Sequence, residues 1–410
     1  MLNTPFSPWP SFSETEIEAA SKVLRSNKVN YWTGNEGKEF EREFAAWTQA
    51  SHGIALANGT LALDLAWHAL DLQPGDEVIV TSRTYLASAS SIVLAGAIPV
   101  FADVDLDSQN ITAKTIEPLI TPRTRAICCV HLAGWPCEMD EINDLASSKG
   151  LAVVEDCAQA HGARYRGVPV GGFGQIGAWS FCQDKIMTTA GEGGMVTTND
   201  ESLWDRMWSY KDHGKSYKAV HAKDHPPGFR WLHESFGTNW RLTEIQSTIG
   251  RYQLTQMHNW TACRRANAKQ ILDCADQMPA LRVPRPAEHI LHAQYKCYVF
   301  VQPDLLKSGW SRDRIMAEIN AQGVPCFSGS CSEVYLEKAF DNKGLRPEKR
   351  LPNARRLADE SLMFLVHPTL TQQEIGKTCD VLASVVRQAS CSIEPAQAVE
   401  QSSSLQSRAM

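Results

Sequence analysis

Short apolar runs alternate with helical patterns along the first half of the chain. Four such runs lie at 77–80, 98–101, 126–130 and 151–155. Runs this short, without regular polar alternation, are typical of strands that are buried on both faces. Amphipathic segments separate the runs. The sequence therefore predicts an α/β fold in which helices cover both sides of a mostly parallel sheet.

Two amphipathic helices are predicted before the sheet. Ser13 and Glu16 have the spacing of a capping box, and Ile17 and Leu24 fall on one face of the helix that follows. The second helix is marked by aromatic residues at spacings of four and three, namely Phe40, Phe44 and Trp47. Helical periodicity of this kind predicts packing against the body of the protein.

The pattern changes after about Trp240. A long helical stretch, a strand at 297–301 and a capped helix beginning near Thr371 indicate a second, smaller α/β domain. From Ala389 onward the chain has six serines and no aromatic residue, which is typical of a disordered tail. The predicted division is N-terminal helices and a large domain at 1–240, a small domain at 241–388, and a tail at 389–410.

Composition and charge limit the class of partner. The chain has 46 acidic and 40 basic side chains and a net charge of −6, so it lacks the basic surface that binds nucleic acid or anionic membranes. The uncharged run at 84–102 contains serine, glycine and proline, which favours helix, turn and strand over a membrane span. The first residues lack a signal-peptide pattern, and the twelve cysteines, of which Cys128 and Cys129 are adjacent, form no CxxC pairs. We therefore expect a cytoplasmic protein with reduced thiols.

An aspartate and a lysine carry the strongest chemical signal. Asp156 follows a buried strand and thus lies at the carboxyl edge, where open α/β sheets bind ligands. Lys185 comes 29 residues later, in a glycine-rich and largely uncharged setting. A lysine in such a setting is a candidate for a lowered pKa and an imine bond to an aldehyde.

This pair suits pyridoxal 5'-phosphate. The amine of Lys185 would bond to the aldehyde, and the carboxylate of Asp156 would keep the pyridine nitrogen protonated so that the ring accepts electrons. Asn58, Gly59 and Thr60 stand at a predicted helix start, where free N–H groups and the helix dipole favour phosphate. No HExxH motif or Cys/His cluster indicates a metal site.

Four segments resemble a known family. The stretches NGTLAL, VVEDCAQAHGA, SFCQDKIMTTAGEGGMV and NWRLTEIQSTIG are similar to those of the DegT/DnrJ/EryC1/StrS family of pyridoxal-phosphate sugar aminotransferases. The resemblance runs from about Ser11 to about Gln388. It implies a fold-type-I large domain like that of aspartate aminotransferase, a smaller C-terminal domain and a homodimer. The reaction it implies is the transfer of an amino group from L-glutamate to a nucleotide-linked keto sugar.

The resemblance also assigns roles to residues. It matches Lys185 with the lysine that bonds to the cofactor and Asp156 with the partner of the ring nitrogen. It places Gln159 at the ring hydroxyl and Tyr85 on the ring face. The phosphate contacts it implies are Gly59, Thr60 and Ser180, together with Asn239, which would reach the phosphate of the neighbouring subunit.

Two segments depart from the family pattern, and both concern the substrate. The stretch 215–235 is long and less familiar, and we expect it to shape the acceptor site. The stretch 326–335 differs from the sequence that is commonest in the family at this position. His213 and Tyr335 are therefore candidate substrate contacts, although a structural role is the commoner outcome for a histidine such as His213.

Several alternatives stay open. Tyr85 could belong to the core, His161 could be a structural histidine, and Trp9 and Trp32 could either stack on a nucleobase or anchor the N-terminal region. The dehydratases of the family replace the lysine with histidine, so Lys185 favours transamination over sugar 3-dehydration. The expected acceptor is a 4-keto-6-deoxyhexose, giving an amino sugar for a surface polysaccharide or glycoside. A 3-keto nucleotide sugar, a cyclitol or another keto acceptor, and a non-enzymatic cofactor-binding regulator are the alternatives.

Overall fold

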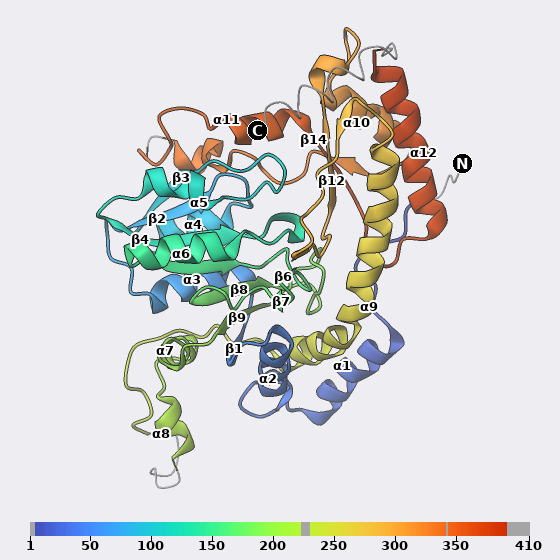
Figure 1. Ribbon diagram of the computed structural model, residues 1–410. Coiled ribbons are helices and arrows are strands. Elements are labelled where there is room, and N and C mark those ends of the chain that lie inside the picture. Colours follow the sequence, from blue (N-terminus) through green and yellow to red (C-terminus); the bar gives the residue numbers. More distant parts are fainter. Residues whose placement is uncertain (1–4, 223–229, 342, 392–410) are drawn as a thin grey trace.

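A seven-stranded sheet forms the centre of the molecule, with helices on both faces (Figure 1). The computed structural model describes residues 5–222, 230–341 and 343–391. In space the strands follow the order β1-β9-β8-β5-β4-β2-β3. Their bounds are β1 His52–Leu56, β2 Glu77–Thr81, β3 Ile98–Ala102, β4 Thr124–Val130, β5 Ala152–Asp156, β8 Ile176–Ser180 and β9 Gly194–Thr198.

The sheet is mostly parallel, as the sequence predicts. Strands β3, β2, β4, β5 and β8 pair in parallel, whereas β9 pairs antiparallel with both β8 and β1. The carboxyl ends of the parallel strands therefore lie at one edge. Asp156 ends β5 and Ser180 ends β8, and these two strands are neighbours in the sheet.

Both faces of the sheet are buried. Successive side chains of a strand point to opposite faces, and each face packs into an apolar cluster. In β2, Val78 and Val80 pack into one apolar cluster, and Ile79 between them packs into another. The first cluster contains side chains of α3 (Gly59–Ala69), α4 (Ala87–Leu94) and α7 (Glu201–Lys211), and the second contains side chains of α6 (Met139–Lys149). The prediction of a sheet covered on both sides is confirmed.

A second sheet lies in the C-terminal part of the chain. Its four strands follow the order β10-β12-β14-β13. Their bounds are β10 Leu281–Arg282, β12 Cys297–Val301, β13 Cys326–Phe327 and β14 Ser361–Phe364. The helices of this part are α9 Glu244–Ala275, α10 Arg312–Ala321, α11 Pro352–Glu360 and α12 Gln372–Ala389. The boundary between the two domains stays a prediction.

A small sheet joins the two parts of the chain. Strand β11 (Ile290–Leu291) pairs with β6 (Arg164–Tyr165), which in turn pairs with β7 (Val168–Pro169). At the C-terminal end, α12 continues to Ala389, and Ser390 forms an isolated bridge with Leu306. Of the predicted tail, residues 392–410 lie outside the described residues.

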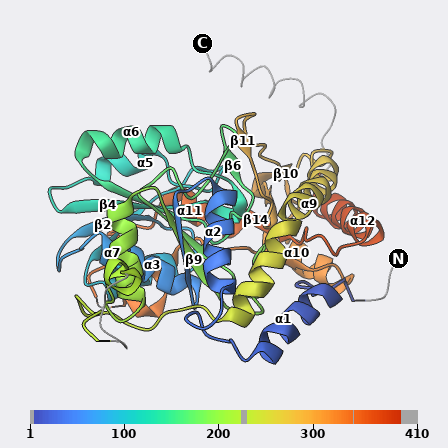
Figure 2. The ribbon, with the colours of Figure 1, turned by 90° about the horizontal axis from the view of Figure 1, so that it is seen from below.

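The N-terminal helices α1 (Glu14–Ser26) and α2 (Glu36–Thr48) pack against α9 (Figure 2). The capping box at Ser13 and Glu16 is present. However, Ile17 and Leu24 are 50% and 55% exposed, and the buried face of α1 instead carries Glu16, Ala19 and Val23. Glu16 faces inward because it also accepts a hydrogen bond from Gln253 of α9, at 3.0 Å.

Shorter elements complete the description. These are α5 Ala113–Ile116, α8 Tyr217–His221 and the 3-10 turns at Glu117–Leu119, Leu132–Gly134, Pro303–Leu305, Val334–Leu336 and Lys338–Phe340. Within the described residues, no helix is both long enough and apolar enough to cross a membrane.

Phe44 on α2 is expected to be important for stability. It is fully buried, with ring contacts to Phe40, Trp179 and Phe181. Phe44→Ala should lower the free energy of unfolding by about 3–5 kcal/mol, because it leaves a cavity in this cluster. Chemical denaturation measures the change. Phe12→Ala, at a 39% exposed position, is the control and should cost much less; equal losses would contradict the assignment.

Candidate active site

A cavity of about 1090 Å³ opens at the carboxyl edge of the central sheet and extends to the four-stranded sheet of the C-terminal part. Seven of the predicted site residues line it, namely Gly59, Thr60, Tyr85, Asp156, Gln159, Ser180 and Lys185. The chain thus brings together residues that lie more than a hundred positions apart. Tyr85 is 71% exposed, so it belongs to the cavity wall and not to the core.

Asp156 is held by two hydrogen bonds. Ser88 on α4 donates its hydroxyl to Oδ2 at 2.7 Å, and the N–H of Ala158 donates to Oδ1 at 3.1 Å. The hydroxyl oxygen of Thr84 lies 2.8 Å from that of Ser88, so a second hydrogen bond holds the Ser88 hydroxyl in place. Hydrogen bonds to a carboxylate favour its ionised form. The arrangement fits a carboxylate that pairs with a positively charged ring nitrogen.

Gln159 has a fixed orientation. Its Oε1 accepts the backbone N–H of Ala133 at 2.8 Å. Because a backbone N–H can only donate, the amide oxygen is committed, and the NH2 group remains as the donor for a ligand. A donor at this point fits the ring hydroxyl of pyridoxal phosphate.

The start of α3 provides an anion site. Asn58 caps the helix by accepting the N–H of Leu61 at 3.0 Å, and the first N–H groups of a helix lack intrahelical partners. Ser180 faces this turn so closely that a Cβ on Gly59 would lie 2.5 Å from the Cβ of Ser180. Only glycine fits here, and the free N–H groups beside the Ser180 hydroxyl suit a phosphate.

Lys185 lies on the loop after β8, half-buried at the cavity wall. Its Nζ is 5.4 Å from the centre of the Tyr295 ring. Trp9 donates its indole N–H to the backbone oxygen of Lys185 at 2.8 Å and packs edge-to-face on Trp260, with ring centres 5.1 Å apart. Trp9 therefore anchors the N-terminal segment beneath the lysine.

A carboxylate stands beside this lysine. Asp184 accepts a hydrogen bond from the hydroxyl of Tyr295. Burial opposes its ionisation, but the charge of Lys185 and the bond from Tyr295 lower the pKa of Asp184 below its ordinary value. The reacting end of the cavity thus contains an ionised carboxylate and an amine next to each other.

Comparison with known proteins shows the family. The model of the DegT/DnrJ/EryC1/StrS aminotransferase family matches residues 10–383. The chain belongs to this family. It is a pyridoxal-phosphate-dependent aminotransferase, and the cavity fits that cofactor at its aldehyde, ring nitrogen, ring hydroxyl and phosphate.

Individual relatives agree with this assignment. This aminotransferase is 44% identical over 391 residues to a GDP-perosamine synthase of Caulobacter vibrioides, with 90% of this chain and 98% of that protein covered. It is 33% identical over 370 residues to a dTDP-3-amino-3,4,6-trideoxy-alpha-D-glucose transaminase of Streptomyces venezuelae, with 90% and 91% covered. A solved aminotransferase from Psychrobacter cryohalolentis is 61% identical and superposes with a TM-score of 0.92, covering 94% of this chain and all of that one.

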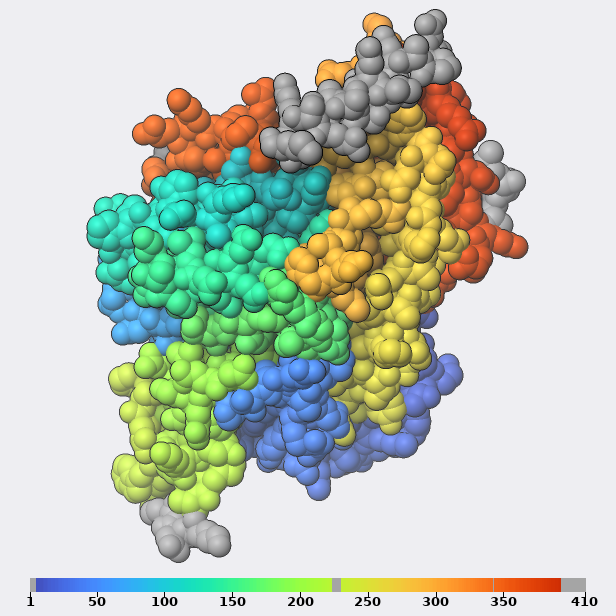
Figure 3. Space-filling model, viewed as in Figure 1, coloured from blue at the N-terminus to red at the C-terminus, as the bar shows by residue number. Residues whose placement is uncertain are grey.

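Three predicted site residues lie elsewhere in the aminotransferase. His213 and Asn239 are exposed and do not line the cavity of their own chain. Asn239 forms an antiparallel bridge with Asp212, the residue before His213, and from this bridge the segment with α8 stands out from the body (Figure 3).

The prediction of Tyr335 as a substrate contact needs correction. Its side chain is 1% exposed, its hydroxyl donates to Glu333, and it accepts the N–H of Leu351 at 2.9 Å. Its ring packs with Phe101 in the core, at 5.5 Å. The residues of this segment that line the cavity include Val334 and Glu337. Tyr335 is a core residue because its turn packs against the sheet.

His161 is a structural histidine, which is one of the alternatives that the sequence leaves open. It is fully buried against Trp179 and Phe181, with ring centres 5.2 and 5.6 Å away. Burial, together with the charges of Lys185 and Arg264, lowers the pKa of His161 to about 3, so the ring is neutral. It does not line the cavity.

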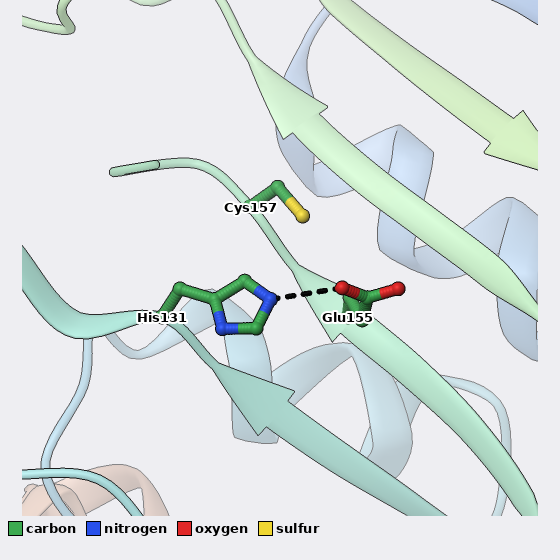
Figure 4. Close-up of side chains that lie close together, drawn as sticks. All are labelled: His131, Glu155 and Cys157. Atoms are coloured by element: carbon green, nitrogen blue, oxygen red, sulfur yellow. Dashed lines mark hydrogen bonds and ion pairs between the residues drawn. The ribbon is translucent and has the colours of Figure 1, made fainter. Parts of the chain in front are cut away.

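A buried network surrounds Glu155, the residue before Asp156 on β5 (Figure 4). His131 and Glu155 are 3.0 Å apart, and Cys157 is close to both. The N–H of Cys137 donates to Nδ1 of His131 at 3.0 Å, so Nε2 carries the proton and donates to Glu155. Such a set of residue types can hold a metal ion, but here His131 is already committed on both ring nitrogens.

Glu155 is committed as well. Its two oxygens accept N–H groups of Gly171, Phe173 and Gly174, each at 2.8 Å. Every strong ligand atom except the thiol of Cys157 thus has a partner within the protein. The network fastens the glycine-rich turn before β8 to β5, and it thereby fixes the strand that delivers Asp156. A charged residue inside an apolar run, as in Val153–Asp156, was the available sequence signal.

Ser88 should matter for cofactor binding. Ser88→Ala removes a hydrogen bond to a buried carboxylate, a loss of about 1.5–3 kcal/mol, so we expect about tenfold or greater weakening of pyridoxal phosphate binding. Equilibrium titration followed by cofactor absorbance measures it. Ser88→Thr should restore binding, and Ser90→Ala, on the same helix, should leave it unchanged. Wild-type affinity in Ser88→Ala would contradict the role.

Proposed function

We propose that this aminotransferase moves the amino group of L-glutamate to a nucleotide-linked keto sugar, with a 4-keto-6-deoxyhexose as the expected acceptor. The observation that carries the proposal is the meeting of Lys185, Asp156, Gln159 and the phosphate turn in one cavity. The relatives support the acceptor class, since their names specify GDP- and dTDP-linked amino sugars. The product would serve a surface polysaccharide or glycoside.

The roles of the side chains follow from their positions. When bound, pyridoxal phosphate supplies an electron sink for a carbanion at the substrate carbon. Asp156 stabilises the positive ring nitrogen, and Gln159 donates to the ring hydroxyl. The Nζ of Lys185 would take the proton from the donor carbon, and it would return a proton to the acceptor carbon in the second half of the reaction.

Cavity size supports a large acceptor. Its volume of about 1090 Å³ lies at the upper end of the range typical of ligand sites, which leaves room beside the cofactor. The walls toward the C-terminal part carry Phe327, Ser330 and Met363, a mixture of apolar and polar groups that suits a sugar and a base.

A homodimer with shared active sites is the expected assembly. Asn239 is exposed and does not line the cavity of its own chain, which supports a role in the partner's site. On the same segment, Trp231 and Phe236 are 83% and 98% exposed. Large apolar side chains left in water indicate a surface that another protein covers. We also infer a cytoplasmic location, because the cysteine content suits a reducing compartment.

Lys185→Ala tests the catalytic role. We expect no release of 2-oxoglutarate from L-glutamate, because the group that moves the proton is missing, while the fold and melting temperature stay unchanged. The wild-type protein, loaded with cofactor and glutamate, should then aminate a member of a panel of GDP-, dTDP- and UDP-linked 4-keto and 3-keto sugars, scored by product mass. Turnover in Lys185→Ala, or a wild type that accepts no sugar, would refute the proposal.

Mixing two inactive variants tests the shared site. If Asn239 serves the partner's cofactor, Lys185→Ala and Asn239→Ala subunits should complement each other after co-refolding. A random mixture should regain about a quarter of wild-type activity, because half of the dimers are mixed and each holds one intact site. Activity is measured before and after subunit exchange. No recovery, in mixtures shown to contain mixed dimers, would contradict sharing.

A further inference from the structure

Lys296 stands at the wall of the same cavity, one position after Tyr295. Its Nζ lies 4.7 Å from the centre of the Tyr295 ring, and the Nζ of Lys185 lies 5.4 Å from the same centre. The two ammonium nitrogens are therefore at most about 10 Å apart. None of the roles described so far uses Lys296.

Nothing in the described part of the chain neutralises this lysine. Across residues 5–222, 230–341 and 343–391, no carboxylate lies within ion-pair distance of its Nζ. The acidic group that acts on it is Asp184, which already accepts a hydrogen bond from Tyr295 and also faces Lys185. A half-buried ammonium without an ion partner is costly, and a negatively charged ligand would offset that cost.

Arg264 adds to the positive charge behind this wall. Its guanidinium is 1% exposed and donates from Nη1 to the backbone oxygen of Tyr295 at 3.3 Å. Its Nε and Nη2 have no hydrogen-bond partner among the residues that the structure describes. Two lysines, Lys185 and Lys296, thus act on the single carboxylate of Asp184, and Arg264 adds a third positive charge that acts on Lys296. The other acidic groups of the cavity stand on other elements, namely Asp156 at the end of β5, Glu192 before β9 and Glu337 after the turn at Val334–Leu336.

We propose that Lys296 binds a carboxylate of the amino-acid donor. The inference rests on the proposed function, because the donor amine must take the place of the Lys185 amine. The carboxylates of an amino dicarboxylic acid then fall within several ångströms of that point, on the side where Lys296 supplies a charge. Lys296 would hold and orient the donor, and would leave the acceptor sugar to other walls of the cavity.

An alternative role for Lys296 is packing alone, in which its aliphatic side chain covers the ring of Tyr295. Packing would require the methylene groups of Lys296 but not its charge, so a methionine would replace this lysine well. A second alternative is a contact to the diphosphate of the acceptor, which shares the same anion chemistry. The donor and the acceptor react one after the other, so the two half-reactions can be measured separately. A contact to the donor would affect the first half-reaction, and a contact to the acceptor diphosphate would affect the second.

The pH dependence gives a further readout. Burial, with help from Arg264 and Lys185 and against Asp184, lowers the pKa of Lys296 to about 8. The ammonium form is therefore lost as the pH rises through about 8, and donor affinity should fall there. The other groups that face this region are Asp184, Tyr295, Tyr298, Lys185, Arg264 and His367. Burial raises the pKa of Tyr295 well above its usual range and lowers that of His367 to about 3, so neither titrates near pH 8.

The experiment uses Lys296→Met in the cofactor-loaded protein. Calorimetric titration with glutarate, a dicarboxylate without an amine, should show about tenfold or greater weakening relative to wild type, the size expected for a lost charged hydrogen bond. Single-turnover 2-oxoglutarate formation should need correspondingly more glutamate. The half-reaction with the active keto sugar should keep its wild-type concentration dependence. Lys296→Arg should restore donor binding and raise the pH at which donor affinity falls. Lys22→Met, which changes an exposed lysine of α1, is the control and should leave donor binding unchanged.

Each other outcome overturns the proposal. Unchanged glutarate and glutamate binding in Lys296→Met would reduce the residue to a packing role. Weakening confined to the keto sugar would assign it to the acceptor diphosphate, and equal weakening of both half-reactions would indicate a general disturbance of the cavity. A wild-type protein that fails to convert glutamate would instead refute the proposed function, a result that requires no variant.

Discussion

The carboxylate of Asp156 is held in a fixed position at the wall of the cavity, and much of the surrounding structure serves to keep it there. Asp156 is only 6% exposed, yet Ser88 and the N–H of Ala158 supply hydrogen bonds to its two oxygens. Those donors fix the carboxylate in the place where the proposed function needs a partner for the ring nitrogen of the cofactor. The position itself comes from β5, because the chain leaves a parallel strand at the edge where ligands bind.

Successive layers hold this edge in place. The His131–Glu155 network joins β4 and β5 to the glycine-rich turn that leads into β8. Beyond β8, Lys185 is anchored from the other side by the indole of Trp9. The cavity therefore has polar groups whose own hydrogen bonds are largely satisfied by the backbone, which limits their freedom and orients them toward a ligand. The C-terminal part closes the cavity with Tyr295 and Lys296.

Sequence patterns predicted the local features well and the long-range ones poorly. The strand at Cys297–Val301, the helix at Met139–Lys149 and the capping box at Ser13 are present because each depends on neighbouring residues. Strands β8 and β9 were not recognised, since glycine, serine and threonine weaken their apolar pattern. Spacing revealed neither the bond from Ser88 to Asp156, 68 positions apart, nor the burial of Tyr335. Lys296 approaches Lys185 only through the packing of the two parts of the chain.

One measurement tests the central assignment directly. The protein loaded with pyridoxal phosphate is reduced with borohydride, which fixes an imine as a stable secondary amine, and its peptides are analysed by mass spectrometry. The account predicts a pyridoxyl group on Lys185 and on no other lysine, with Lys296 unmodified in the same sample. A label on Lys296, or protein that binds the cofactor and carries no label at Lys185, would contradict it.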